Sequence, residues 1–139
     1  MQKFKLIIPV LIGIAGFLIY SESVEAQKTK GKTRPALTKQ LMKGFVAANC
    51  GDLSKALKAE EVKWDDVALR AAMLSEAGYL LLDDGRCPDG DWAKASKALQ
   101  LHGKEVIDAS EKKDLEAAKA AFGKLTAEGC AVCHKAHKK

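Results

Sequence analysis

The chain ends in a helix-forming segment that decides the fold, DLEAAKAAFGKLTAEGCAVCH (residues 114–134). Asp114 is a good N-cap residue, and apolar residues then recur at spacings of three and four at Leu115, Ala118, Phe122 and Leu125. This spacing predicts an amphipathic helix that leads directly into two cysteines.

The two cysteines belong to Cys130-Ala131-Val132-Cys133-His134, which is the C-x-x-C-H pattern of c-type haem attachment. In this pattern each thiol adds across one vinyl group of the haem, because two intervening residues separate the sulfurs by about one helical turn. The adjacent His134 is then positioned as the proximal ligand of the iron. The motif predicts one covalent haem c bound through Cys130 and Cys133.

Two other interpretations of the cysteine pair fit less well. A thioredoxin-like C-x-x-C needs a strand before the helix, and no stretch of this sequence alternates apolar and polar residues as a strand does. A zinc site would need all four of its ligands, Cys130, Cys133, His134 and His137, within eight residues of one helix end. That spacing is not typical of zinc sites.

Three more helices are predicted upstream. The first runs from Pro35 to Leu57, with an interruption expected at 49–52 because Gly51 costs about 1 kcal/mol relative to alanine. The second covers about 65–82, a dense turn signal follows at 83–90, and the third is capped by Asp89 or Asp91. Four amphipathic helices with short connections predict an all-α fold, an antiparallel up-down-up-down four-helix bundle with one covalently bound haem c.

The first 26 residues have the pattern of a cleaved signal peptide. Lys3 and Lys5 precede the apolar run 6–20, and small residues occupy the two recognition positions of Val24-Glu25-Ala26. A retained anchor is the alternative, but the run is shorter than the roughly 20 residues of a membrane span. We therefore expect a signal peptide at 1–26, a basic flexible leader at 27–34 and the bundle at 35–139. The mature protein is expected in the periplasm or another extracytoplasmic compartment, without a stable membrane span.

The charge of the chain suggests a protein partner. Its formal net charge is +5, with basic residues gathered in the leader and at the C-terminus. These residues are either solvated tails or a surface that steers an acidic redox partner protein. Nucleic acid is not an expected partner, because aromatics are few and no nucleic-acid motif is present.

The C-terminal position of C-x-x-C-H on a fourth helix resembles the class II c-type cytochromes, the cytochrome c′ family. The similarity covers residues 35–139: 114–123 with 130–134 resembles the family's last helix, 38–43 its first helix, and 62–65 stands at its Pro-Tyr-Asp turn. There are two departures. His137-Lys138 replaces the usual Tyr-Arg, and the chain has four cysteines instead of two. The resemblance implies a homodimer, or a heterodimer with another cytochrome, through the first two helices.

The resemblance also implies that the distal side of the iron faces the first helix. Three residues compete for the position of sixth ligand, and an iron whose distal position is open or blocked by a bulky side chain is the alternative to all three. Met42 matches the methionine of six-coordinate members, with core filling as its alternative role. Cys50 continues the same apolar stripe. Cys87 lies in the 83–90 turn beside Arg86 and a helix N-terminus, both of which favour a thiolate. A Cys50–Cys87 disulfide is the further alternative, although about 22 Å of helix separates Cys50 from Pro35 at the helix start.

These features predict an electron carrier outside the cytoplasm and not an enzyme. With a thiolate as sixth ligand the haem would have a low potential and would bind NO or CO when reduced. The alternative function is an NO or CO sensor or scavenger without an electron-shuttle role. A catalytic haem protein is not favoured, because the only spare histidines are His102, expected as a partly exposed surface residue, and His137.

Overall fold

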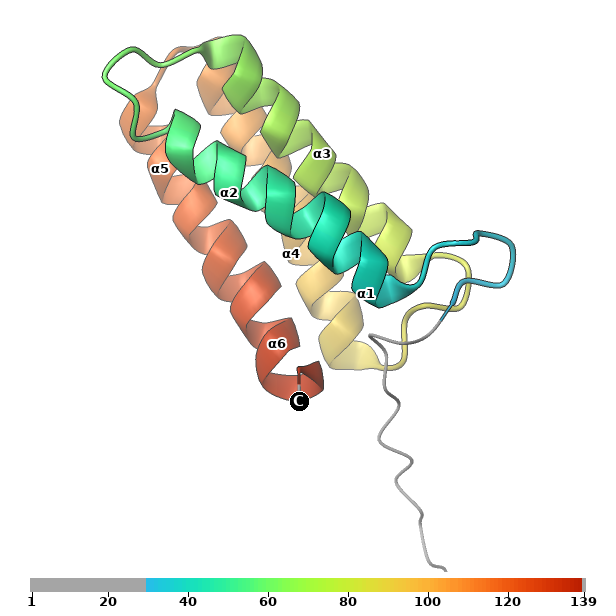
Figure 1. Cartoon of the computed structure of the whole chain (residues 1–139). Helices are drawn as coiled ribbons and strands as arrows, with labels where there is room; N and C mark the ends of the chain where they lie inside the picture. Colours follow the sequence, from blue (N-terminus) through green and yellow to red (C-terminus); the bar gives the residue numbers. More distant parts are fainter. Residues whose placement is uncertain (1–29, 139) are drawn as a thin grey trace, which may run out of the picture.

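The computed structural model describes residues 30–138, and most of this part of the chain is helical. Four helices follow one another, two of them built from several segments (Figure 1). The first comprises α1 (Thr38–Leu41), η2 (Met42–Val46) and α2 (Ala47–Ala56); the second is α3 (Trp64–Leu82); the third is α4 (Gly90–Glu111); the fourth comprises α5 (Leu115–Lys124), η3 (Leu125–Ala131) and α6 (Val132–His137). The only β feature in this range is one isolated bridge between Lys30 and Leu37. The predicted all-α helical bundle is thus confirmed.

The predicted N-cap of the fourth helix is confirmed, and of the two candidates for the third helix, Asp89 and Asp91, Asp89 is the N-cap. The Asp89 carboxylate accepts a hydrogen bond from the backbone N–H of Trp92 at 2.9 Å, which starts α4 at Gly90. The Asp114 carboxylate accepts one from the N–H of Ala117 at 3.0 Å and starts α5. Each carboxylate satisfies a backbone donor that has no partner within its helix, so the sequence signal has a direct physical cause.

The interruption expected at 49–52 is wrong, because α2 continues through Gly51. The first helix is instead irregular one turn earlier, in the π-helical segment η2, and the fourth helix has a matching π-helical segment in η3. Wide turns of this kind are rare in proteins overall, and those that occur are often found at functional sites. Both lie against the same cavity, which is described below.

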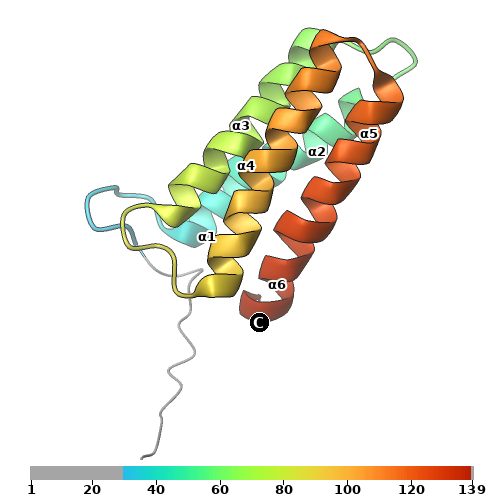
Figure 2. The ribbon, with the colours of Figure 1, turned by 180° about the vertical axis from the view of Figure 1, so that it is seen from behind.

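The core runs along the middle of the bundle. α3 and α4 lie side by side, with the first helix on one side of them and the fourth on the other (Figures 1 and 2). The large apolar side chains of the core that have no exposed surface come from all four helices: Leu53, Val67, Leu74, Val106 and Leu125. The start of α1, the turn between α3 and α4, and the end of α6 lie at one end of the molecule, as the up-down topology predicts (Figure 1).

At this end, the described part of the leader has fixed partners. The Asp84 carboxylate accepts hydrogen bonds from the backbone N–H groups of Thr33 and Arg34 at 2.9 and 3.1 Å. The buried Arg86 donates to the carbonyl oxygen of Ala36 at 2.8 Å. Residues 30–36 are therefore attached to the α3–α4 turn instead of forming a free tail. The predicted signal peptide lies outside the described residues, and within them no helix is long and apolar enough to cross a membrane.

Two glycines should respond in opposite ways to alanine. A Cβ on Gly78 of α3 would lie 2.5 Å from the backbone oxygen of Ser96 on α4, whereas a Cβ on Gly51 of α2 would meet nothing within 4 Å. We expect Gly78→Ala to destabilise the protein by about 1–3 kcal/mol, because the α3–α4 pair must move apart. Gly51→Ala should stabilise it by about 0.5–1 kcal/mol. Urea unfolding followed by circular dichroism measures both; a stable Gly78→Ala variant would contradict the close α3–α4 packing.

Candidate functional site

A cavity of about 450 Å³ opens between the first helix, the N-terminal half of α4 and the end of the fourth helix. Its walls are mainly apolar: Val46, Ala47, Leu81, Ala95 and Leu99. Three lysines also line it: Lys39, Lys43 and Lys138. Its remaining side chains include five with sulfur or imidazole groups: Met42, Cys50, Cys130, Cys133 and His134. The cavity therefore combines apolar walls, cationic groups and the complete C-x-x-C-H motif.

The motif forms one wall of this cavity, on η3 and α6. Cys133 is buried, and burial together with the negative charge of Asp89 raises the pKa of its thiol to about 11. His134 is exposed, and partial desolvation and the nearby Lys138 ammonium lower its pKa below the usual value. A lowered pKa keeps the imidazole neutral, which is the form that binds metals.

Cys50 faces the motif from the first helix. The Cys130 thiol donates a hydrogen bond to the Cys50 sulfur, which lowers the pKa of Cys50 to about 7 despite its partial burial. The same contact and burial raise the pKa of Cys130. The two sulfurs are therefore direct neighbours, although they lie 80 residues apart in the sequence.

The other two predicted distal candidates separate. Met42 lines the cavity from η2, eight residues before Cys50 on the same helix. Cys87 does not line it: its thiol is directed to its own turn, 3.3 Å from the carbonyl oxygen of Asp89. Arg86, expected to favour a Cys87 thiolate, instead donates a hydrogen bond to the carbonyl oxygen of Ala36, just before α1. All four cysteines are free thiols, so Cys50 and Cys87 are not bonded to each other.

The end of the fourth helix is held against the start of α4 by His137. Its ring packs edge-on against Trp92 with centroids 5.3 Å apart, and its Nε2 lies 3.3 Å from the Asp89 carboxylate. The Trp92 indole in turn donates to the carbonyl oxygen of Leu81 at 2.7 Å. His137 is thus a structural residue of α6. It fixes the helix turn that carries Cys133 and His134, a role that the sequence did not reveal.

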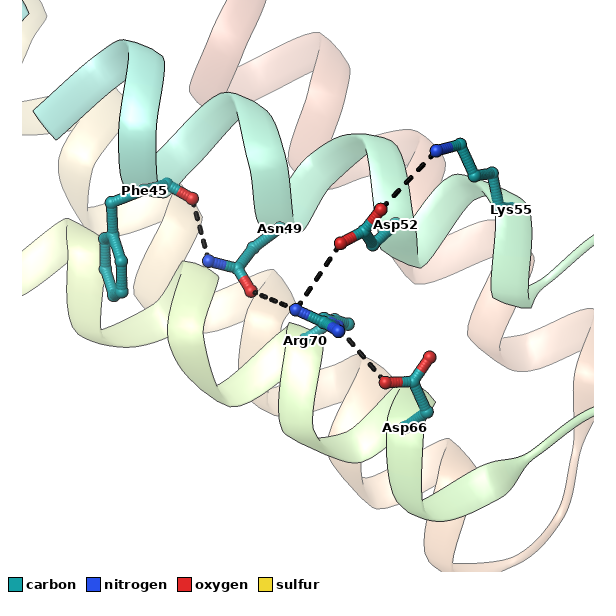
Figure 3. A network of polar contacts seen from close by, with 6 residues as sticks. All are labelled: Phe45, Asn49, Asp52, Lys55, Asp66 and Arg70. Carbon is teal, nitrogen blue, oxygen red and sulfur yellow. Dashed lines mark hydrogen bonds and ion pairs between the residues drawn. The ribbon is translucent and has the colours of Figure 1, made fainter. Parts of the chain in front are cut away.

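A polar network holds the first helix in place beside Cys50 (Figure 3). The Arg70 guanidinium of α3 contacts Asn49, Asp52 and Asp66 at 3.3, 3.4 and 3.1 Å. Asn49 also donates to the carbonyl oxygen of Phe45 at 2.8 Å. Because these contacts fix the face of α2 that is turned toward α3, they also fix the rotation that places Cys50 in the cavity. The sequence shows only the local parts of this network, the i,i+4 pair Asp66–Arg70 and the i,i+3 pair Asp52–Lys55.

His102 was expected at the surface, and this expectation is wrong. Its side chain on α4 is only 4% exposed and lies outside the cavity. Its Nδ1 lies 2.9 Å from the Glu105 carboxylate and its Nε2 3.2 Å from that of Glu128 on η3. Burial lowers the pKa of the ring, but the two carboxylates outweigh this effect and the net shift is upward. The protonated His102 ring therefore links α4 to η3, a segment that lines the cavity, through an ion pair with Glu128.

A histidine with a raised pKa stabilises the fold in its protonated form. That contribution is complete below the unfolded pKa of about 6.5 and is lost as the pH rises through the folded value. We expect His102→Gln to cost about 1 kcal/mol of folding free energy near pH 5.5 and clearly less near pH 9, where the ring is neutral. The cost is modest because both carboxylates are partly exposed. Unfolding in urea at the two pH values measures the difference.

Lys104→Gln is the matched control on the same helix. Lys104 pairs with Asp108 at 2.7 Å, and this contact raises the pKa of the ammonium group, which therefore does not titrate between the two pH values. Its substitution should change stability equally at both. Equal costs for His102→Gln at both pH values would contradict the link to Glu105 and Glu128.

A site for a bare metal ion is not supported by the described residues. Between positions 30 and 138 no group of three or more His, Cys, Asp or Glu side chains is arranged to hold one. The zinc alternative therefore gains nothing from the geometry.

Comparisons with protein-family models, curated proteins and solved structures found no match to this chain. A function for the cavity is therefore inferred from the residues that line it.

Proposed function

We propose that this protein is a monohaem c-type cytochrome of the class II type that carries single electrons outside the cytoplasm. The observation that carries the proposal is the position of the motif, since Cys130, Cys133 and His134 all line one mainly apolar cavity. When bound there, haem c would supply an iron that takes up and releases one electron by alternating between the ferric and ferrous states.

The residues around the cavity fit this cofactor. Its volume of about 450 Å³ is within the roughly 300–1,000 Å³ of small-molecule and cofactor sites. The apolar walls suit the flat ring of a haem. The three lysines Lys39, Lys43 and Lys138 suit its two carboxylates, because each offers an ammonium group to an anion.

Each residue has a separate role in the proposal. Cys130 and Cys133 bind the ring covalently, and His134 is the proximal iron ligand. The apolar walls exclude water, which lowers the local dielectric and helps to tune the potential. The exposed position of His134 puts the site near the protein surface, where an acidic redox partner protein can approach the basic C-terminus. A homodimer or a heterodimer with a second cytochrome is part of the same proposal.

Gas binding is the second candidate function. The first helix contributes the uncharged side chains Met42, Val46 and Ala47 to the wall opposite the motif, and these offer apolar contacts to a small diatomic ligand. NO or CO would suit it better than a charged ligand. In this role the protein would sense or scavenge the gas without passing electrons onward.

Expression together with a haem c attachment system tests the main proposal. The purified chain should gain the mass of one haem, keep it under denaturing conditions and be reduced by one electron per chain. A chain that carries no covalent haem under these conditions would overturn the proposal. A haem protein that binds CO tightly but does not exchange electrons with any acidic carrier protein would favour the second candidate.

A further inference from the structure

The contact between the Cys50 and Cys130 thiols makes a second reaction available to the haem-free chain, the oxidation of two thiols to a disulfide. Cys50 of α2 and Cys130 of η3 line the same cavity from two different helices, and their thiols lie close enough for each to shift the pKa of the other. Cys87 is directed to the carbonyl oxygen of Asp89, and Cys133 is buried near Asp89. Cys130 is thus turned toward Cys50 on another helix instead of toward its neighbour in the motif.

We propose that Cys50 and Cys130 form an intramolecular disulfide in the haem-free chain, and that this bond must be reduced before Cys130 can receive haem. The first half stands on the position of both thiols in one cavity and on their contact there, while the second half rests on the proposed function. The bond would join α2 to η3 across the cavity. It would also use the sulfur that the haem thioether needs, so the two states exclude each other.

The reaction is ordinary thiol–disulfide exchange with a small-molecule or protein disulfide as the oxidant. The Cys50 sulfur attacks one sulfur of the oxidant and releases its other half as a thiol. The Cys130 sulfur then attacks the Cys50 sulfur and releases the second half. The two cysteines lose two electrons and two protons in total, and the oxidant becomes two thiols. A dithiol reverses both steps.

Peptide mapping after oxidation tests the bond. The full chain is made without haem attachment, checked for helix content by circular dichroism, equilibrated with oxidised glutathione and digested with trypsin. Cleavage after lysine and arginine puts Cys50 in peptide 44–55, Cys87 in 87–94 and the motif cysteines in 125–135. We expect a loss of two hydrogens in mass and a link between peptides 44–55 and 125–135.

Three serine variants identify the sulfurs. Cys50→Ser should lose the link, whereas Cys133→Ser and Cys87→Ser should keep it. The same oxidation in concentrated urea should give the local Cys130–Cys133 bond instead, because closing a short loop costs an unfolded chain less entropy. A Cys130–Cys133 bond, a Cys50–Cys87 bond or four free thiols in the undenatured chain would overturn the proposal, whether or not that chain proves helical.

Haem attachment to the oxidised chain tests the second half. Attachment should require a dithiol for the wild type and should proceed without one for Cys50→Ser. If the 44–55 to 125–135 link forms but no chain ever acquires haem, the proposed function fails and the disulfide stands. If haem attaches to the wild type equally with and without the dithiol, the gating role fails and the proposed function stands.

Discussion

The variant Cys130→Ser, Cys133→Ser is expected to lose all covalently bound haem while its helical fold persists. Haem c is held by thioethers, and both sulfurs of the motif line the cavity, so their removal leaves no covalent attachment point there. The wild type and the variant would be produced with the same attachment system. Intact-protein mass and the visible spectrum after acid extraction of loose haem measure the difference.

Cys87→Ser is the matched control for this experiment. It removes a thiol that is also half-buried but lies outside the cavity. It should retain the full amount of haem. Equal haem loss in the control would show a general effect of lost thiols, and a double variant that still carries covalent haem would exclude C-x-x-C-H as the attachment site.

Much of the fold was accessible from the sequence because its signals are local. The N-caps at Asp89 and Asp114 and the helix 65–82 depend on short-range spacing and hydrogen bonds within a few residues. The break expected at Gly51 failed for the opposite reason. A glycine costs about 1 kcal/mol in a helix, and the packing of Leu53 and the Arg70 network outweighs that cost.

The candidate site likewise combines residues that are adjacent in sequence, whose positions could be predicted, with residues from distant segments, whose positions could not. The motif residues Cys130, Cys133 and His134 are adjacent in sequence, so their joint position on one cavity wall follows from the helix itself. The neighbours of the motif come from distant segments. The apolar stripe of the first helix predicts that Cys50 shares a face with Met42, and the contacts of α2 with α3 hold that face toward the cavity. No pattern within the first helix, however, specifies that this face meets Cys130 on the fourth helix. Asp89 and Trp92 meet His137 only through the bundle topology.

Cys87 shows how sequence position can mislead. It belongs to the turn between α3 and α4, and this turn lies at the same end of the bundle as the end of α6, as an up-down topology requires (Figure 1). Its thiol, however, contacts the carbonyl oxygen of Asp89 within its own turn. Being at the correct end of a bundle specifies the neighbourhood of a side chain, whereas its direction depends on turn geometry that composition does not specify.

The distal side of the iron provides the second large expected effect. Met42 and Cys50 are the two cavity-lining residues of the first helix with a sulfur atom, whereas Cys87 lies outside the cavity. We expect the variant Met42→Ala, Cys50→Ser to remove a protein sixth ligand, so that the ferric and CO-bound spectra change. Cys87→Ser should leave both spectra unchanged.

The two single variants then identify the sulfur, because methionine and thiolate act on the iron in opposite directions. Methionine favours the ferrous state and raises the potential, while an anionic thiolate favours the ferric state and lowers it. Axial ligands tune haem potentials over about 0.8 V, so loss of the true ligand should move the midpoint by at least about 0.1 V. A fall of the midpoint potential in Met42→Ala assigns methionine as the ligand, and a rise in Cys50→Ser assigns the thiolate.

The Cys130 hydrogen bond that lowers the pKa of Cys50 is lost once Cys130 becomes a thioether, so a thiolate at Cys50 would need the iron itself as its stabilising partner. Unchanged potentials and spectra in both single variants and the double variant would exclude the first helix as the source of the ligand.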